Sequence, residues 1–168
     1  MPNYRRLRVP GATYFFTVHL AERGGTLLTD RIDLLREAYR LTVAEQPVRC
    51  DAMVILPDHI HAVWTLPAGD ADFSRRWQKL KGRFTHATGL RGLQSPSMVE
   101  KREAGLWQRR FWEHLIRDAE EGRRAVAHCL SDPVRHGLAT KAEDWPFSTI
   151  HRDLRAQVDR TITLRAVA

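Results

Sequence analysis

The sequence predicts an α+β domain in which helices pack against a β-sheet. Runs of aromatic and β-branched residues, which favour strands, occupy residues 13–20, 48–56 and 59–64. Residues 30–44 and 72–88 instead repeat apolar side chains at steps of three and four, the period of a helix with one buried face. The resulting order of strand, helix, strand, strand and helix places both kinds of element in one domain.

The first strand is expected over Thr13–Leu20, and its nearly continuous apolar character indicates a central position in the sheet. Gly24 and Gly25 break it, and Thr29 and Asp30 supply the N-cap of a helix that runs to about residue 44. The buried stripe of this helix is predicted to contain Ile32, Leu34, Leu35, Ala38, Tyr39 and Leu41.

The second half of the chain predicts one clear helix, a strand and a late helix. The helix over about Asp72–Thr88 has an apolar stripe, and residues 89–105 lack any period and predict a loop. A strand is expected over residues 106–116. The pair Asp118 and Glu121 resembles a capping box, which predicts a helix to about residue 130, ended by Pro133.

The length of 168 residues and the 43% hydrophobic content predict one globular domain over residues 1–157, followed by a loose C-terminal tail over residues 158–168. The net charge of +7 indicates a polyanionic partner, with nucleic acid ahead of a membrane surface. Two cysteines are too few for a disulfide scaffold and favour a reducing cytoplasm. The sequence predicts neither a secretory signal nor a membrane helix.

A His-x-His motif follows the turn at Pro57 and Asp58. Because side chains alternate along a strand, His59, His61 and Val63 are expected on one face. Two imidazoles side by side on a strand form half of a metal site. The alternative interpretation is that both are ordinary polar positions on a half-exposed strand.

Three groups of basic and aromatic residues are candidates for contact with nucleic acid. The first group opens the chain, the second forms one arc of the helix over residues 72–88, and the third mixes tryptophan with arginine in the strand over residues 106–116. For the first group a solvated basic start is an equal alternative, and for the third so is a core strand with arginines at its rim. The groups are Arg5, Arg6 and Arg8; Arg75, Arg76, Lys79 and Arg83; and Trp107, Arg109, Arg110 and Trp112.

The motif Leu56-Pro57-Asp58-His59-Ile60-His61 resembles the HUH endonucleases, and more narrowly the REP-associated tyrosine transposases of bacteria. Further ordered blocks over most of the chain carry the same resemblance. They are residues 3–6, 11–18, 72–77, 107–114, 132–137 and 144–149. The resemblance implies a ferredoxin-like α+β fold with an antiparallel sheet as its platform.

The resemblance also implies a reaction. His59 and His61 would bind a divalent metal, Mg²⁺ or Mn²⁺. A tyrosine on the late helix would attack single-stranded DNA, forming a 5′-phosphotyrosine bond and freeing a 3′-hydroxyl, while an amide one turn later helps to hold the metal. Single-stranded or hairpin repeat DNA is the implied partner of a monomer or homodimer in the bacterial cytoplasm.

The sequence departs from this pattern at both late positions. Alignment of the block Asp132-Pro133-Val134-Arg135-His136-Gly137 puts His128 in the place of the tyrosine and Asp132 in the place of the amide. The Asp132 carboxylate suits Mg²⁺ or Mn²⁺ better than an amide does. For His128 three roles are open, namely a nucleophile that forms a phosphohistidine, a general base for water, or a metal ligand in a protein that no longer cleaves.

Three functions are therefore compared. The first is a protein that binds hairpin or single-stranded DNA and, if active, cleaves and rejoins it by metal-assisted transesterification. The second is a domesticated relative that recognises repeat hairpins without cutting them, and the feature that divides the two is His128 together with Asp132. The third is a small metal-dependent hydrolase whose basic surface is incidental. Loss or strong weakening of transposase chemistry is expected, because imidazole does not copy the reach of a phenol.

Overall fold

A computed structural model describes residues 6–157. The predicted DNA contact Arg5 and the predicted tail over residues 158–168 lie outside the described residues. Among the described helices, none is both long and apolar enough to cross a membrane. The elements are β1 (Thr13–His19), α1 (Leu27–Asp30), α2 (Ile32–Glu45), β2 (Arg49–Ile55), β3 (His59–Thr65), α3 (Phe73–Thr88), α4 (Pro96–Glu100), β4 (Trp112–Leu115), α5 (Ala119–Arg135) and a 3₁₀ turn (Ala142–Asp144).

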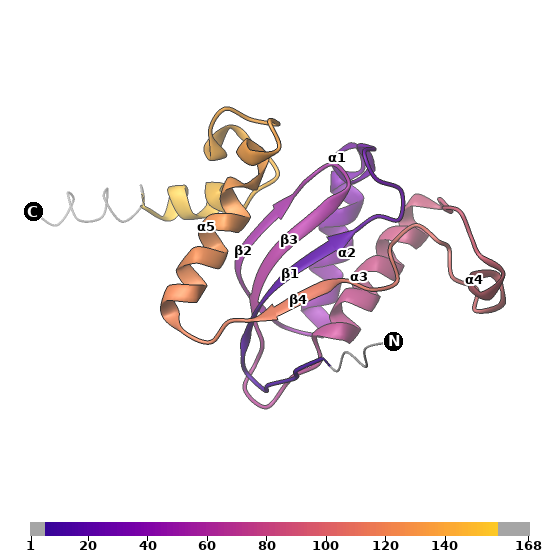
Figure 1. Ribbon diagram of the computed structural model, residues 1–168, viewed down its shortest axis with the longest axis horizontal. Helices are drawn as coiled ribbons and strands as arrows, with labels where there is room; N and C mark the ends of the chain where they lie inside the picture. Colours follow the sequence, from indigo (N-terminus) through magenta and orange to yellow (C-terminus); the bar gives the residue numbers. More distant parts are fainter. Residues whose placement is uncertain (1–5, 158–168) are drawn as a thin grey trace, which may run out of the picture.

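The sheet has four strands in the order β2-β3-β1-β4, and every neighbouring pair is antiparallel. Two βαβ halves interleaved in this way, with α2 and α3 as their crossover helices, give the ferredoxin-like arrangement. Figure 1 shows β1 and β3 in the middle of the sheet. The expected α+β class, the antiparallel sheet and the central position of the first strand are therefore confirmed.

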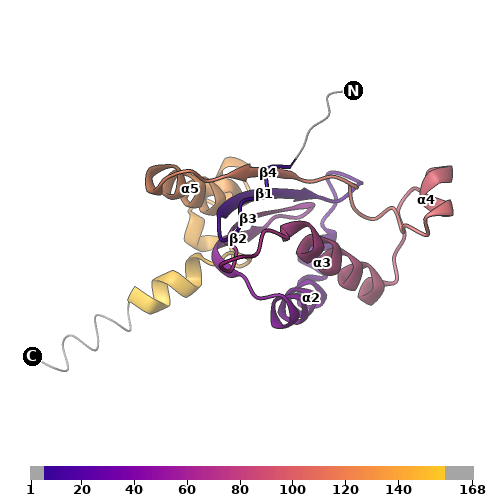
Figure 2. The same ribbon diagram turned by 90° about the horizontal axis from the view of Figure 1, so that it is seen from below.

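The two faces of the sheet are covered by different helices. Even-numbered residues of β1, such as Phe16, pack with Trp77 of α3 in the larger core, whereas Phe15 faces the other way, in a smaller core with Cys129 of α5. Trp64 and Trp77 stack at 4.2 Å between ring centroids in the larger core. Figure 2 shows α2 and α3 together on one side of the sheet. The opposite face is left for α5, and the histidines of β3 point towards it.

The chain departs from the sequence prediction in several places. The predicted helix that ends near residue 44 corresponds to α2, which is preceded by the short helix α1, and Leu41 is 38% exposed rather than buried in the stripe. The predicted loop over residues 89–105 contains α4. The predicted strand over residues 106–116 is reduced to β4, because Trp107 leaves the ladder for a single bridge to Leu20.

The late helix does not end before Pro133. Proline removes one backbone donor, but α5 continues to Arg135 because the N–H groups of His136 and Leu138 still donate to the carbonyls of Asp132 and Pro133, at 3.0 and 2.8 Å. This extra turn matters for the site, since it carries His136 to the same face of α5 as Asp132.

Candidate functional site

The two histidines of β3 lie in the smaller core layer, under α5. His59 is 4% exposed and His61 is 7% exposed. In the register of the sheet they are paired with His19 and Thr17 of β1, so all four side chains share one face. The expectation that His59 and His61 share a face is confirmed, and the alternative of a half-exposed strand does not hold because both rings are buried.

Asp58 fixes the orientation of the His59 ring. The Asp58 carboxylate accepts hydrogen bonds from His59 Nδ1 at 2.6 Å, from the Gly24 N–H at 2.7 Å and from Arg23 Nε at 2.8 Å. Burial raises the pKa of the Asp58 carboxyl, but these hydrogen bonds outweigh burial and lower it to about 2. Because an ionised carboxylate only accepts, His59 Nδ1 donates in this hydrogen bond, and Nε2 is the ring atom that faces Asp132.

The His61 ring is fixed in a similar way by Thr17, whose hydroxyl lies 2.9 Å from His61 Nδ1. Burial lowers the pKa of His61 to about 4, although the neighbouring Asp132 carboxylate acts in the opposite direction. The ring is therefore neutral near pH 7, the form in which imidazole binds metals.

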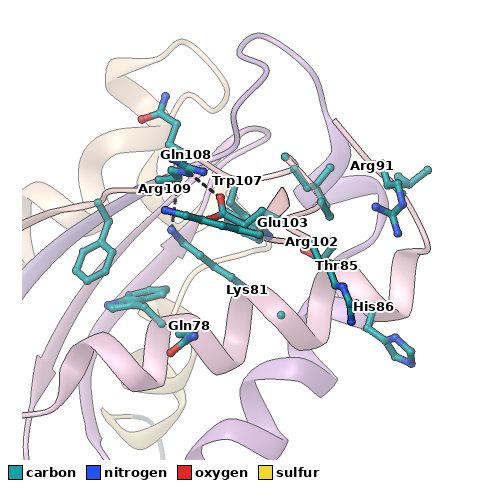
Figure 3. A pocket seen from close by; sticks show the side chains of 18 of the residues that line it. Gln78, Lys81, Thr85, His86, Arg91, Arg102, Glu103, Trp107, Gln108 and Arg109 are labelled. Carbon is teal, nitrogen blue, oxygen red and sulfur yellow. Dashed lines mark hydrogen bonds and ion pairs between the residues drawn. The ribbon is translucent and has the colours of Figure 1, made fainter. Parts of the chain in front are cut away.

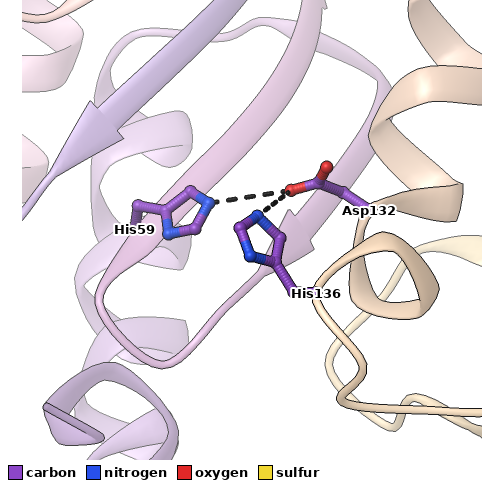
Figure 4. A group of neighbouring side chains, drawn as sticks. All are labelled: His59, Asp132 and His136. Atoms are coloured by element: carbon purple, nitrogen blue, oxygen red, sulfur yellow. Dashed lines mark ion pairs between the residues drawn. The ribbon is translucent and has the colours of Figure 1, made fainter. Parts of the chain in front are cut away.

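Asp132 reaches both rings from α5. Its Oδ2 atom lies 3.0 Å from His61 Nε2 and 3.7 Å from His59 Nε2, and the residue is 4% exposed. His136, one turn later on the same helix, places its Nε2 atom 3.2 Å from the same oxygen, as Figure 4 shows. The structure therefore brings the three predicted ligands together and adds a fourth side chain.

This arrangement fits a divalent cation. His61 Nε2, His136 Nε2 and His59 Nε2 lie 3.0, 3.2 and 3.7 Å from Asp132 Oδ2, so imidazole nitrogens and a carboxylate oxygen, donors that divalent transition metals bind, meet at this point. A buried carboxylate also needs a compensating charge. Two groups of side chains bring their ligand atoms within 4.8 Å of one another, His59 with Asp132 and His136, and His61 with His128 and Asp132, so Asp132 is common to both.

His128 lies beside this cluster, one turn before Asp132. Its ring centroid is 5.7 Å from that of His61 and 5.5 Å from that of Phe15. The guanidinium of Arg135 contacts His128 Nδ1. Because arginine can only donate, Nδ1 must accept, and a neutral His128 then carries its proton on Nε2. His128 also belongs to a group, with His61 and Asp132, whose ligand atoms lie within 4.8 Å of one another.

No tyrosine of the described chain approaches the cluster. Tyr14 is 1% exposed, and its hydroxyl accepts from the Val9 N–H and donates to the Leu7 carbonyl. Tyr39 belongs to α2, on the opposite side of the sheet. The third tyrosine of the sequence, Tyr4, lies outside the described residues.

The predicted basic arc of α3 is not a single exposed surface. Arg76 is 1% exposed and donates to the carbonyls of Gln46, Pro47 and Asp72 and to the Asp70 carboxylate, so its prediction as a DNA contact is wrong. Lys79 and Arg83 both pair with Glu45 of α2, and Arg75 remains exposed at the surface. The four residues do not form one exposed basic surface, because Arg76 occupies a buried position in the core.

The aromatic and arginine residues before and within β4 also separate into two groups. Trp107 is 8% exposed and packs edge-on against Phe84, which leaves its face unavailable for stacking on a base. Trp112 is 55% exposed and stacks on His114. Arg109 pairs with Glu103 at 2.7 Å, and Arg110 is exposed.

A basic groove of about 910 Å³ runs between α3 and residues 89–111. Lys and Arg residues greatly outnumber acidic residues along the groove. Glu103 is the single acidic residue among the described lining residues. The basic lining residues are Arg6, Lys81, Arg91, Lys101, Arg102 and Arg109. Figure 3 shows Lys81 extending from α3 towards Gln108 at the other wall. The charge and depth of this groove suit a polyanion.

Lys81 is the least ordinary cation of the groove. Its Nζ atom donates to the Gln108 carbonyl at 2.9 Å and lies 5.5 Å from the centre of the Phe111 ring. Burial, with a smaller contribution from Arg6, lowers the pKa of Lys81 to about 8. Two members of the first predicted group lie nearby, since Arg6 and Arg8 both donate to the Ser74 hydroxyl.

The wall of the groove depends on a glycine contact. A Cβ atom at Gly92 would lie 2.3 Å from the Gly105 carbonyl oxygen, so Gly92→Ala must displace backbone and is expected to lower the free energy of unfolding by about 1–3 kcal/mol. Gly82→Ala in α3 has open space around it and is expected to raise that free energy by about 0.5–1 kcal/mol. Thermal unfolding of both variants measures the difference. Equal melting temperatures of the two variants would contradict the close packing of Gly92 against Gly105.

Two contributions to these sites were not assigned from the sequence. His136 was visible as a histidine four residues after Asp132, but the expected end of the helix at Pro133 concealed its position. Lys81 lies on α3 outside the predicted basic arc, and no pattern in the sequence distinguishes a lysine that crosses a groove from a solvated one.

The comparisons with known proteins agree with this fold. No protein-family model matches the chain. A REP-associated tyrosine transposase of Escherichia coli K12 is 44% identical over 154 residues, which are 92% of this chain and 86% of that protein. A relative from Haemophilus influenzae Rd, named for the same family, is 42% identical over 94% of this chain and 90% of its own length.

A solved structure extends the comparison. It is that of a REP-associated tyrosine transposase bound to a REP hairpin, it is 43% identical to this chain, and it superposes with a TM-score of 0.82 over 92% of this chain and 86% of that one. Identity at this level over nearly the full length of both partners leaves one assignment: the chain belongs to the REP-associated tyrosine transposase family.

Proposed function

We propose that this transposase-family protein binds hairpin or single-stranded repeat DNA. The observation that carries the proposal is the basic groove, where Arg and Lys side chains line a cavity of about 910 Å³ with a single paired carboxylate among the described lining residues. The relative whose structure contains a REP hairpin supports the choice of DNA. Exposed Arg75, Arg110 and Trp112 would extend the contact, the tryptophan by stacking on an unpaired base.

We also propose a divalent metal held by His59, His61 and Asp132. Such an ion, when bound, supplies charge stabilisation to the phosphate oxygens as a Lewis acid. Of the two predicted cations, Mn²⁺ suits the donor set better than Mg²⁺, because imidazole nitrogen is a poor ligand for Mg²⁺. The chain itself supplies the orientation of both rings, through Asp58 and Thr17.

Recognition of DNA without covalent cleavage is the form of this function that the site supports best. His128 occupies the place where the family resemblance expects a tyrosine, so this position offers no hydroxyl oxygen to attack phosphorus. The second candidate is metal-assisted cleavage by another nucleophile. It is favoured by the contacts of the buried His59 and His61 rings with the buried Asp132 carboxylate, which a protein that only binds DNA would not require.

A binding titration tests the proposal. A fluorescent single strand that folds into the repeat hairpin is titrated with protein at 50 and 200 mM salt, beside an unstructured strand of equal length. Contact with about six phosphates predicts a loss of affinity of about 10³-fold over this range. The same mixtures, with Mn²⁺ added, are analysed for nicks and for a protein–DNA adduct. Absence of binding at 50 mM salt would overturn the proposal, and nicking would select the second candidate.

The role of the groove has its own pH dependence. Because the folded pKa of Lys81 lies near 8, its charge is present below this pH and lost above it. Hairpin affinity is therefore expected to fall about fivefold between pH 7 and pH 9, which corresponds to about 1 kcal/mol for one charge-assisted hydrogen bond. Lys81→Arg keeps the charge and should flatten the profile, while Lys81→Met should bind weakly at both pH values. If the hairpin affinity of Lys81→Arg fell with pH as steeply as that of the wild type, this role of Lys81 would be contradicted.

We place the protein in the bacterial cytoplasm as a monomer or a homodimer. Both named relatives are bacterial proteins, and the chain contains only two cysteines, which fits a reducing compartment. Light scattering with and without hairpin DNA distinguishes the two assembly states.

A further inference from the structure

Gly82 lies in the interior of α3, where neither its backbone nor its packing requires a glycine. Glycine is less favourable than alanine inside a helix, so its presence needs a local reason. Gly82 has the helical backbone conformation, whereas Gly89 at the C-cap of the same helix has a φ of 66°. Apart from its neighbours along α3, no described atom lies within 4 Å of the position that a Cβ atom of residue 82 would take. The reason for this glycine therefore lies outside the packing of the described chain.

Gly82 opens onto the basic groove. Gln78 and His86, one turn before it and one turn after it, line the same groove, and all three residues are exposed. Figure 3 shows Gln78 and His86 on α3, along one wall of the groove. The glycine leaves a gap in a row of polar side chains, and at this gap the helix backbone itself forms the surface.

A positive charge lies close to the gap without filling it. Lys81, the preceding residue, crosses the groove and donates to the Gln108 carbonyl at 2.9 Å, with its Nζ atom 5.9 Å from the centre of the Trp107 ring. Its ammonium group is therefore held at the opposite wall. Arg91 and Arg102 add charge to the same groove. An anionic chain that these cations attract can reach the surface of α3 at Gly82.

Close approach of two backbones is the remaining use of a helical glycine. The opposite wall shows this use within the protein, because a Cβ atom at Gly92 would lie 2.3 Å from the Gly105 carbonyl oxygen. Gly82 has no comparable partner among the described residues. The sugar–phosphate backbone of DNA suits the position, since it is anionic and accepts hydrogen bonds from polar side chains.

We infer that one strand of the bound DNA crosses α3 at Gly82, with its sugar–phosphate backbone against the helix surface. Gln78 and His86 then contact the same strand from either side of the glycine. The inference rests on the proposed function and deepens it, because it assigns the surface of α3 that the DNA touches. Gly82 lowers the stability of α3 and provides the room that the strand needs.

Substitution of Gly82 tests the inference through two measurements that should change in opposite directions. Gly82→Ala should raise the melting temperature and weaken hairpin binding at least about fivefold, because the added methyl group overfills the contact. Gly82→Leu should weaken binding further, by about a hundredfold. Misfolding does not explain a loss of affinity in Gly82→Ala, because that variant is expected to be more stable than the wild type.

The matched control is Gly122→Ala in α5. Gly122 is also inside a helix, and a Cβ atom there would lie 3.6 Å from Ile116 Cγ2, an ordinary contact distance. It is not among the described residues that line the basic groove. This variant should also raise the melting temperature, but its affinity for the hairpin should equal that of the wild type.

The salt dependence of binding separates a steric effect from a loss of charge. Gly82→Ala changes no charge and should keep the wild-type slope of log affinity against log salt, whereas Lys81→Met should reduce that slope by about one. Equal hairpin affinity of the wild type, Gly82→Ala and Gly82→Leu would overturn the inference and leave the proposed function intact. A wild type that binds neither the hairpin nor the unstructured strand would overturn both.

Discussion

Arg76→Ala is expected to lower the free energy of unfolding by about 3–5 kcal/mol, the cost of breaking a buried charge network by removing one partner. The guanidinium donates to the Gln46, Pro47 and Asp72 carbonyls at 3.2, 2.7 and 3.1 Å, and to Asp70 at 2.7 Å. Its removal leaves those acceptors without their donor and opens a cavity beside Trp77. For a domain of this size the melting temperature should fall by about 6–20 °C.

The adjacent residue provides a matched control. Arg75→Ala removes the same side chain one position earlier, from the exposed surface of α3, and should change the free energy of unfolding by less than about 0.5 kcal/mol. In the hairpin titration the order reverses, because only Arg75 is free to contact a phosphate. Thermal and denaturant unfolding measure the first difference. Equal stability of the two variants would mean that the Arg76 network contributes nothing.

The Arg76 network also predicts an acid dependence. The hydrogen bond from Arg76 lowers the pKa of the Asp70 carboxyl, followed in importance by the hydrogen bond from the Asp72 N–H. A carboxyl whose pKa is lowered by folding adds stability above its unfolded pKa, and this stability is lost as the pH falls. The stability difference between wild type and Arg76→Ala should therefore narrow in acid.

The same arginine marks the limit of what the sequence predicts about α3. The alternation of Phe73, Trp77 and Phe84 determined which face is buried, and all three are fully buried. The basic arc was wrong at Arg76 because a helical wheel records the direction of a side chain and not the acceptors around it. The carbonyls at the end of α2, at Gln46 and Pro47, become its partners only through the packing of α2 against α3.

The metal cluster could also be predicted only in part, because a sequence pattern does not show which side chains the tertiary packing brings together. Strand periodicity placed His59 and His61 on one face, and the family resemblance supplied Asp132 from a helix far along the chain. His136 depended on whether the helix passes Pro133, which the local sequence argues against and tertiary contacts decide. The protons on His59 and His128 were also beyond the sequence, because each is fixed by a partner, Asp58 in one case and Arg135 in the other.

The donor set and the His128 position therefore bear on one question, whether the site can break a phosphodiester. His128→Tyr is expected to restore a nucleophile and to produce a covalent protein–DNA adduct with hairpin DNA and Mn²⁺. The phenol oxygen would form a bond to phosphorus while the bond from phosphorus to the 3′ oxygen breaks, leaving a 5′-phosphotyrosine and a free 3′-hydroxyl. Adduct formation should exceed the wild-type level by at least about 10³-fold, since loss of a covalent nucleophile costs about 10⁶-fold in a well-studied protease.

His128→Phe is the control for this gain, because it supplies the same ring as tyrosine without the hydroxyl. Both substitutions remove the contact with Arg135, so any effect of freeing that arginine appears in both. Denaturing electrophoresis of end-labelled DNA separates adduct from simple nicks. Adduct in His128→Tyr alone would mean that the site keeps its capacity to orient a phosphodiester and lacks only the attacking oxygen. Adduct of equal yield in the wild type would instead make His128 itself the nucleophile, and no adduct in any of the three proteins would mean that the site lacks more than the attacking oxygen.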